Sequence, residues 1–258
     1  ALEIAAGLLD AFGFDERNLP VHDAVMIPLA LWVYHNQITS KVVSHRNHKQ
    51  QRDSARDYVL QATLIQDYWG RGVDQNLSDI RDAIVAEKGK GKPFPFDEVL
   101  AKLAESGNPM TIEDEAINEI LDLEYNKRYT FSALARLVGG GLDFKSIVAQ
   151  VDHIFPQAIL KESELRDLGL ADDIIQKIQE RTNTLPNLQL LTELRNNEKD
   201  SLMPSEWLKQ MDSDADRERY TRLHLLGEIP ETIDGFIEWH DARRERLKER
   251  LVKLLRTE

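Results

Sequence analysis

Two residues that could do chemistry stand side by side at the end of an apolar run, in the stretch "VDHIFPQ" at 151–157. The carboxylate of Asp152 offers the oxygen ligands that hard divalent cations prefer. The imidazole of His153 has an ordinary pKa close to physiological pH, which suits a general base. In a strand the two side chains would point to opposite faces. By itself, the pair is more simply explained as a surface turn after a strand.

Three further polar residues follow at a spacing that could bring them to the same place. Asn187 lies near the start of the apolar segment "PNLQLL", and Asn196 and Lys199 lie one helical turn apart in the polar segment "TELRNNEKDS". On a helix these last two share a face. An amide oxygen can bind a hard cation, and a lysine ammonium can neutralise a phosphate oxygen as a point charge. The expected order of strand, strand and helix forms a ββα unit with its polar residues at one end.

The elements around this unit are expected to be helical, because apolar residues recur at three- and four-residue spacing. The expected helices span residues 1–12, 22–39, 53–69, 76–87, 95–106, 112–124, 130–138, 163–182 with a break at Gly169, and about 231–256. The glycines at 139–141 must end the helix before them, and we place a domain boundary there. A helical hairpin must be inserted between His153 and Asn187.

The run "DHIFPQ … PNLQLL … RNNEK" resembles the HNH, or His-Me finger, nuclease motif. The wider pattern resembles the C-terminal nuclease domain of GmrSD-type modification-dependent restriction enzymes and SspE-like anti-phage effectors. The shared features are "YNKRYTFSALARLV" before the motif, "PSEWL" after it and the closing "IDGFIEWHDARRERLKERL". The resemblance covers residues 125–258 well and residues 1–124 more loosely.

The resemblance implies a mainly α fold, with a helical N-terminal region followed by a ββα-metal nuclease core embedded in helices. Residues 1–140 would be a helical domain, a scaffold or linker to a sensing domain that this sequence lacks. Residues 141–258 would be the HNH nuclease domain with its closing C-terminal helix. The chain also opens without a methionine and directly in a helical pattern, so we expect a fragment of a longer protein.

The implied activity is a metal-dependent DNA endonuclease, the effector module of a restriction or anti-phage defence protein. His153 would activate water, Asp152 and Asn196 would bind one Mg²⁺ or Mn²⁺, Asn187 would hold the loop that bears His153, and Lys199 would assist at the phosphate. One cation and one base favour one-metal chemistry that nicks one strand at a time. A double-strand break would then need a homo-oligomer or two successive events.

The sequence departs from the family pattern and leaves alternatives open. The third motif residue is an asparagine rather than a histidine, and Asn197 beside it could be the ligand, although the spacing to Lys199 and Asn187 favours Asn196. A non-catalytic DNA-binding or regulatory module with an HNH-like fold is the rival function. An RNA substrate is a third, because one-metal phosphodiester chemistry is the same on either backbone.

The net charge and its distribution along the chain bear on whether the protein binds DNA. The net charge of −12 argues against tight independent binding to DNA. The segment 41–56 nevertheless carries five basic residues against Asp53 alone, so it is a candidate phosphate-contacting patch or, equally well, a solvated loop. The expected nucleic-acid contacts are Arg46, Lys49, Arg52, Arg195 and Asn197. His45 and His48 in the same segment could face a metal together, but a solvated polar face is the preferred interpretation.

The composition excludes several kinds of chemical site and a membrane-spanning protein. The chain has no cysteine, which excludes disulfides, thiolate metal sites and a cysteine nucleophile, and fits a reducing cytoplasm. Its longest apolar run, "AVMIPLALWV" at 24–33, is half of the roughly 20 residues that a membrane span needs. We therefore expect a cytoplasmic protein without membrane contact. Its partners would be DNA and the missing N-terminal domain or a partner subunit.

Overall fold

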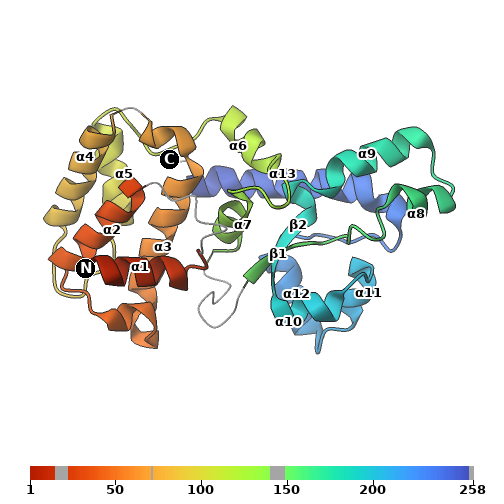
Figure 1. Cartoon of the computed structure of the whole chain (residues 1–258), viewed down its shortest axis with the longest axis horizontal. Coiled ribbons are helices and arrows are strands. Elements are labelled where there is room, and N and C mark those ends of the chain that lie inside the picture. The colour runs from red at the N-terminus through yellow and green to blue at the C-terminus, as the bar shows by residue number, and fades with distance from the viewer. Residues whose placement is uncertain (15–22, 71, 140–148, 256–258) are drawn as a thin grey trace. The chain divides into compact units, whose positions relative to one another are not determined.

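The computed structural model describes residues 1–14, 23–70, 72–139 and 149–255, which group into two compact units (Figure 1). Residues Ala1–Ile112 make up most of the first unit, and the second comprises Glu113–Gly141 and Ala149–Leu254. The boundary expected near residue 140 lies beside residues 140–148, which are outside the described residues. Whether a scaffold and a nuclease domain divide the chain functionally stays a prediction.

The described residues of the first unit form helices and connecting loops without a strand, as expected. Its helices are α1 (Leu2–Ala11), α2 (Asp23–His35), α3 (Lys49–Leu64), α4 (Val73–Ala86) and α5 (Phe96–Glu105), with short 3₁₀ turns at Ser40–Val43, Arg46–His48 and Gln66–Trp69. Aromatic rings fill part of its core, where Phe94 stacks on Tyr58 and meets the edge of Trp32. The helix expected from residue 53 begins earlier, at Lys49, so the basic segment runs into its first turns.

The second unit is mainly helical with one small sheet. Its helices are α6 (Asp114–Leu121), α7 (Thr130–Val138), α8 (Glu162–Asp167), α9 (Asp172–Thr182), α10 (Glu193–Lys199), α11 (Pro204–Lys209), α12 (Asp214–Leu223) and α13 (Phe236–Leu255). Gly139 ends α7 with a positive φ of 56°, and Gly169 separates α8 from α9 with a φ of 78°. Both breaks were expected, since glycine adopts this conformation without steric cost. Across the described residues, no helix is long and apolar enough to cross a bilayer.

The sheet consists of β1 (Ala149–His153) and β2 (Leu188–Thr192), paired antiparallel. Asp152 faces Gln189 across the pair and His153 faces Leu188. Helix α10 follows β2 directly and contacts both strands, while α8 and α9 form the expected insertion between them. Helix α7 also contacts both strands, which explains why it belongs with this unit. The strand–strand–helix order is therefore present.

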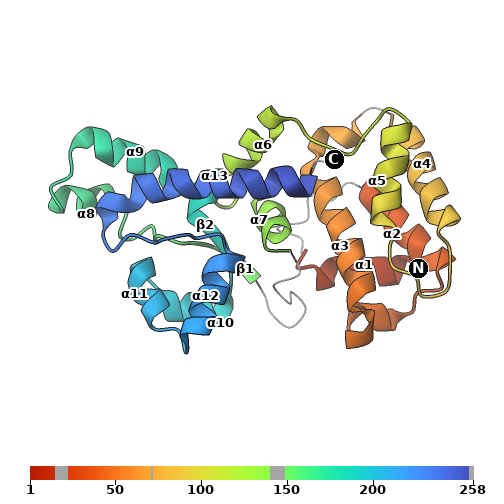
Figure 2. The same cartoon turned by 180° about the vertical axis from the view of Figure 1, so that it is seen from behind.

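Helix α13 lies on one side of the two-stranded sheet, and α10, α11 and α12 lie on the other, as both views show (Figures 1 and 2). The core between the hairpin and α13 contains Phe155, whose ring packs on Phe236 and Trp239. The guanidinium of Arg243 on α13 is buried and donates to the carbonyl oxygens of Pro186, Leu188 and His224. Arg243 thereby fixes the start of β2 to the long helix.

Two buried histidines of the second unit lead to a prediction about pH. Burial lowers the pKa of His224 to about 3 and that of His240 to about 4. The folded protein keeps both rings neutral, whereas the unfolded chain binds protons below about pH 6.5. Acidification therefore favours the unfolded state, and we expect each histidine to cost about 2 kcal/mol of unfolding free energy between pH 7 and pH 5.

Urea unfolding at these two pH values, followed by circular dichroism, measures this loss. The variant His240→Gln should lose less stability on acidification than the wild type. The variant His45→Gln changes an exposed histidine of the first unit and should behave as the wild type. If His240→Gln and the wild type have the same pH dependence, His240 is not the group that titrates.

Candidate functional site

The carboxylate of Asp152 lies at the end of β1 and accepts two hydrogen bonds on one oxygen. Gln189 Nε2, from the facing position of β2, donates to Asp152 Oδ2 at 2.9 Å, and Lys199 Nζ, from α10, lies 3.1 Å from the same atom. Within the described chain, no group donates to Oδ1. The side chain is about 15% exposed. One carboxylate oxygen is thus held by the protein, and the other is left for a ligand.

Lys199 occupies the centre of this arrangement. Its side chain is only 1% exposed, and its ammonium also donates to the backbone oxygen of His153 at 2.6 Å. Burial lowers the pKa of Lys199, and the nearby charge of Asp152 opposes this by raising it. The expected contact with a phosphate does not fit this position, because the ammonium is enclosed and already bonded. Its geometry instead favours a role in holding Asp152 and His153.

His153 points to the other face of β1, as alternation along a strand requires. The residue is 6% exposed, and its ring packs on Tyr125 with 4.4 Å between ring centroids. Nε2 lies 2.9 Å from Asn183 Oδ1, which also accepts a bond from Gln157. Since an amide oxygen only accepts, Nε2 carries the hydrogen and Nδ1 keeps the lone pair of the neutral ring.

The charge state of His153 follows from its surroundings. Burial lowers the pKa of His153, the hydrogen bond to Asn183 and the charge of Asp152 raise it, and the charge of Lys199 lowers it again. The net direction is downward, so the ring is neutral at physiological pH. A neutral imidazole with an unprotonated Nδ1 is the state that a general base requires.

Asn187 lies fully buried where the chain enters β2. Its Oδ1 accepts a hydrogen bond from the Phe155 amide at 2.9 Å, and its Nδ2 donates to the backbone oxygens of Phe155 and Thr182 at 3.1 and 2.8 Å. These bonds tie the segment after His153 to the end of α9. This is the position that the expected loop-holding role requires, and the effect on His153 stays a prediction.

Asn196 lies on the same face of β1 as the Asp152 side chain. Its Nδ2 is 3.5 Å from Gln150 Oε1, and Gln150 precedes Asp152 by two residues on the same side of β1. Asn196 is half-buried. The side chain of Asn197, the alternative ligand and an expected nucleic-acid contact, lies outside the described residues. Arg195 is exposed but paired with Glu198 and Asp212, at 3.2 and 3.7 Å.

These positions allow a test of whether the site suits the expected cation. Asp152 offers a free carboxylate oxygen and Asn196 an amide oxygen from the same face, and both are hard donors. Such sparse ligation fits Mg²⁺ or Mn²⁺, which keep several water ligands. In the described part of the chain, no cluster of three or more histidine, aspartate or glutamate side chains could hold a metal by itself. Among the described residues, His45 and His48 therefore belong to no such cluster.

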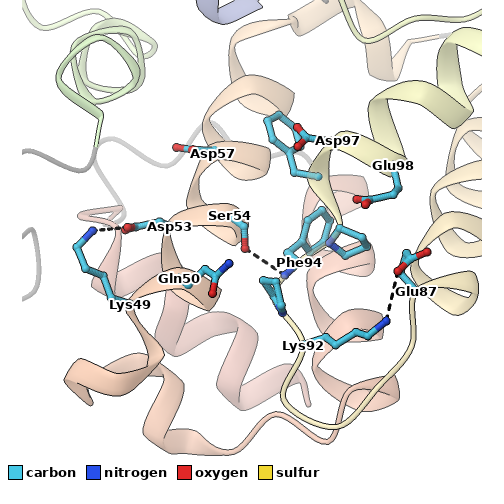
Figure 3. Close-up of a pocket in the computed structure, with 13 residues that line it drawn as sticks. Lys49, Gln50, Asp53, Ser54, Asp57, Glu87, Lys92, Phe94, Asp97 and Glu98 are labelled. Carbon is cyan, nitrogen blue, oxygen red and sulfur yellow. Dashed lines mark hydrogen bonds and ion pairs between the residues drawn. The ribbon is translucent and has the colours of Figure 1, made fainter.

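The basic segment of the first unit is not a free patch. Arg52 donates to the backbone oxygens of Val42 and His45 at 2.9 and 2.7 Å, and Lys49 is paired with Asp53. Lys49 also borders a cavity of about 690 Å³ whose lining includes five carboxylates and the rings of Phe94 and Phe96 (Figure 3). Arg46, the third expected nucleic-acid contact in this segment, is exposed. The surroundings therefore weaken the expected attraction for phosphate.

Several residues around the site were not found from the sequence. Gln189 is a buried amide inside an apolar strand, and this was a detectable signal, because such a group needs a partner. Tyr220 comes from an element outside the motif, whereas Asn183 lies four residues before Asn187 and Tyr125 opens the shared segment "YNKRYTFSALARLV", but none of the three carries such a signal. The backbone amide of Tyr125 donates to the backbone oxygen of Asn183 at 2.7 Å, and this bond places Tyr125 beside Asn183.

The fold and site together define a mainly helical protein whose polar residues gather at the end of a two-stranded sheet followed by a helix. Residues 94–256 match the family described as GmrSD restriction endonucleases, C-terminal domain. Since the match spans more than half of the chain, the protein belongs to this family, and membership implies a nuclease role in restriction systems. The match contains every residue of the hairpin site. No curated protein matches the chain.

The enclosed position of Lys199 predicts that its loss weakens the fold. The variant Lys199→Met keeps the apolar stem but leaves Asp152 and the His153 carbonyl without this donor. Removing one partner of a buried ion pair costs roughly 3–5 kcal/mol. Because Asp152 keeps Gln189 and some contact with water, we expect the unfolding free energy to fall by about 2 kcal/mol.

Urea unfolding of the full chain measures this change. Lys209→Met is the matched control, because Lys209 forms an exposed ion pair with Glu231 at 2.9 Å, and we expect it to lose less than about 1 kcal/mol. Equal losses in the two variants would show that the enclosed contact of Lys199 does not stabilise the fold.

Proposed function

We propose that the second unit is an HNH-type endonuclease that hydrolyses phosphodiester bonds of DNA, nicking one strand at a time as the effector of a restriction or anti-phage system. The family match, which spans both strands and α10, carries the proposal. It is supported by the contacts of Lys199 with Asp152 and the His153 backbone, and by the contact of Asn196 with Gln150 beside Asp152 on β1. The side chains of Asp152, His153 and Asn196 have the chemistry that a one-metal nuclease needs.

His153 is the general base in this proposal. Its Nδ1 accepts a proton from the attacking water, and Asn183 fixes the ring in the tautomer that leaves Nδ1 unprotonated. Burial keeps the ring neutral before the reaction. Asn187 holds the segment after His153, so that the ring keeps its place at the strand end.

Asp152 and Asn196 hold the divalent cation, Mg²⁺ or Mn²⁺, through their oxygens. When bound, the cation stabilises the negative charge that develops on the phosphate and on the leaving oxygen. Lys199 acts indirectly in this scheme, by holding the Asp152 carboxylate and the His153 backbone in one arrangement. Arg46 is an exposed cation that can contact the DNA backbone, whereas the exposed Arg195 is paired with Glu198 and Asp212. Target choice belongs to a sensing domain or partner subunit.

A nicking assay on supercoiled plasmid with Mg²⁺, with Mn²⁺ or with EDTA tests this function. We expect cation-dependent nicking by the full chain and at least roughly a 100-fold loss in His153→Ala, since a general base contributes about 10²–10⁴-fold. The control His45→Ala changes an exposed histidine and should nick as the wild type.

Other outcomes of the same assay decide between functions. Nicking by His153→Ala at the wild-type rate would overturn the mechanism, provided that circular dichroism shows both proteins folded. Retardation of the plasmid without cutting under every cation condition would favour a DNA-binding module. Cleavage of RNA alone, in a parallel assay, would move the substrate from DNA to RNA.

A further inference from the structure

Two hydrogen bonds between side chains connect the Asp152 carboxylate to α12, a helix outside the unit formed by β1, β2 and α10. Gln189 faces Asp152 across the two strands, and residues in such a pair lie on the same face of a sheet. Its Nε2 donates to Asp152 Oδ2 at 2.9 Å, and its Oε1 accepts a hydrogen bond from the Tyr220 hydroxyl. Both polar ends of the Gln189 amide are therefore used.

The chemistry of the two ends fixes the direction of these hydrogen bonds. A carboxylate can only accept hydrogen bonds, so the Gln189 amide must present Nε2 to Asp152 and Oε1 to Tyr220. Tyr220 must then donate, which requires a protonated hydroxyl. Burial raises the pKa of Tyr220, and the charge of Asp152 raises it further, so the hydroxyl stays protonated. No other orientation of the amide satisfies both neighbours.

Packing holds Gln189 and Tyr220 in place. Gln189 is only 1% exposed, between the buried residues Leu188 and Leu190 of β2. The Tyr220 ring meets the edge of Trp207 on α11, with ring centroids 5.0 Å apart, and packs against His224 at 4.4 Å. A buried amide in an apolar strand costs free energy unless it is bonded. The bonds to Asp152 and Tyr220 offset this cost and leave the amide no alternative partner.

The consequence concerns the orientation of the Asp152 carboxylate. Gln189 and Lys199 both bond to Oδ2, which leaves Oδ1 for a ligand. We propose that Gln189 and Tyr220 are positioning residues. They orient the Asp152 carboxylate so that it binds a divalent cation through Oδ1 and not through Oδ2. This inference rests on the proposed function, and it extends the cation site to α12.

Mn²⁺ affinity, measured by titration of the full chain with detection of free Mn²⁺ by electron paramagnetic resonance, tests the proposal. The variant Gln189→Met keeps the side-chain volume and removes both bonds, whereas Tyr220→Phe removes only the hydroxyl. Loss of a group that orients a metal ligand typically weakens binding by about 10–100-fold. We expect a rise of this size in the Mn²⁺ Kd for Gln189→Met, and a smaller rise for Tyr220→Phe.

The double variant distinguishes positioning from a general effect on the fold. Because Tyr220 acts on Asp152 through Gln189, the double variant should have the Mn²⁺ Kd of Gln189→Met alone, whereas independent effects would multiply. Tyr68→Phe is the matched control, since its hydroxyl donates to the Asn108 oxygen at 3.0 Å in the first unit. This variant should bind Mn²⁺ as the wild type does.

The outcomes separate this inference from the proposed function. Unchanged Mn²⁺ affinity in folded Gln189→Met and Tyr220→Phe, with Asp152→Ala unable to bind, would overturn the positioning role while the cation site stands. Equal Mn²⁺ binding by the wild type and Asp152→Ala would overturn both the positioning role and the metal part of the proposed function. Thermal unfolding followed by circular dichroism establishes that each variant is folded at the titration temperature.

Discussion

The buried contact of Lys199 with the first strand is the interaction on which the rest of the site depends. One ammonium from α10 bonds to the Asp152 carboxylate and to the His153 backbone oxygen. Burying two opposite charges costs desolvation free energy that their attraction alone does not always offset. Here Gln189 and the backbone oxygen supply further bonds to the two charged groups. The contact also depends on strand register, because a slip by one residue would turn Asp152 to the other face.

Adjacent residues of a strand point to opposite faces, which creates a geometric problem for a site that uses both Asp152 and His153. The structure places the pair at the last residues of β1, where the strand ends. Asn187 defines this end, because it bonds to Phe155 and accepts the Ile154 amide on its backbone oxygen at 2.7 Å. The proposed function therefore requires that a phosphate meet side chains from both faces beyond the end of the strand. Each face then has its own support, Gln189 for Asp152 and Asn183 for His153.

Much of this arrangement could be predicted from the sequence, because it depends on local pattern. Helical periodicity, the glycines at 139 and 169, and the order of two strands and a helix all follow from neighbouring residues. The enclosed position of Lys199 could not be predicted, because spacing gives the face of a helix but not what covers that face. Tyr220 reaches Gln189 only through the packing of α12, and no short-range pattern carries that information.

Charge pairing within each unit bears on how the protein would meet DNA. In the second unit, Arg195 is paired with Glu198 and Asp212, and Lys199 is enclosed. In the first unit, Lys49 is paired with Asp53 beside a cavity lined with carboxylates. Cations that are already neutralised release few counterions from DNA, and this release supplies most of the non-specific affinity. With a net charge of −12, the chain therefore attracts a duplex weakly by itself. A weak attraction of this kind agrees with the proposal that a sensing domain or partner subunit selects the DNA.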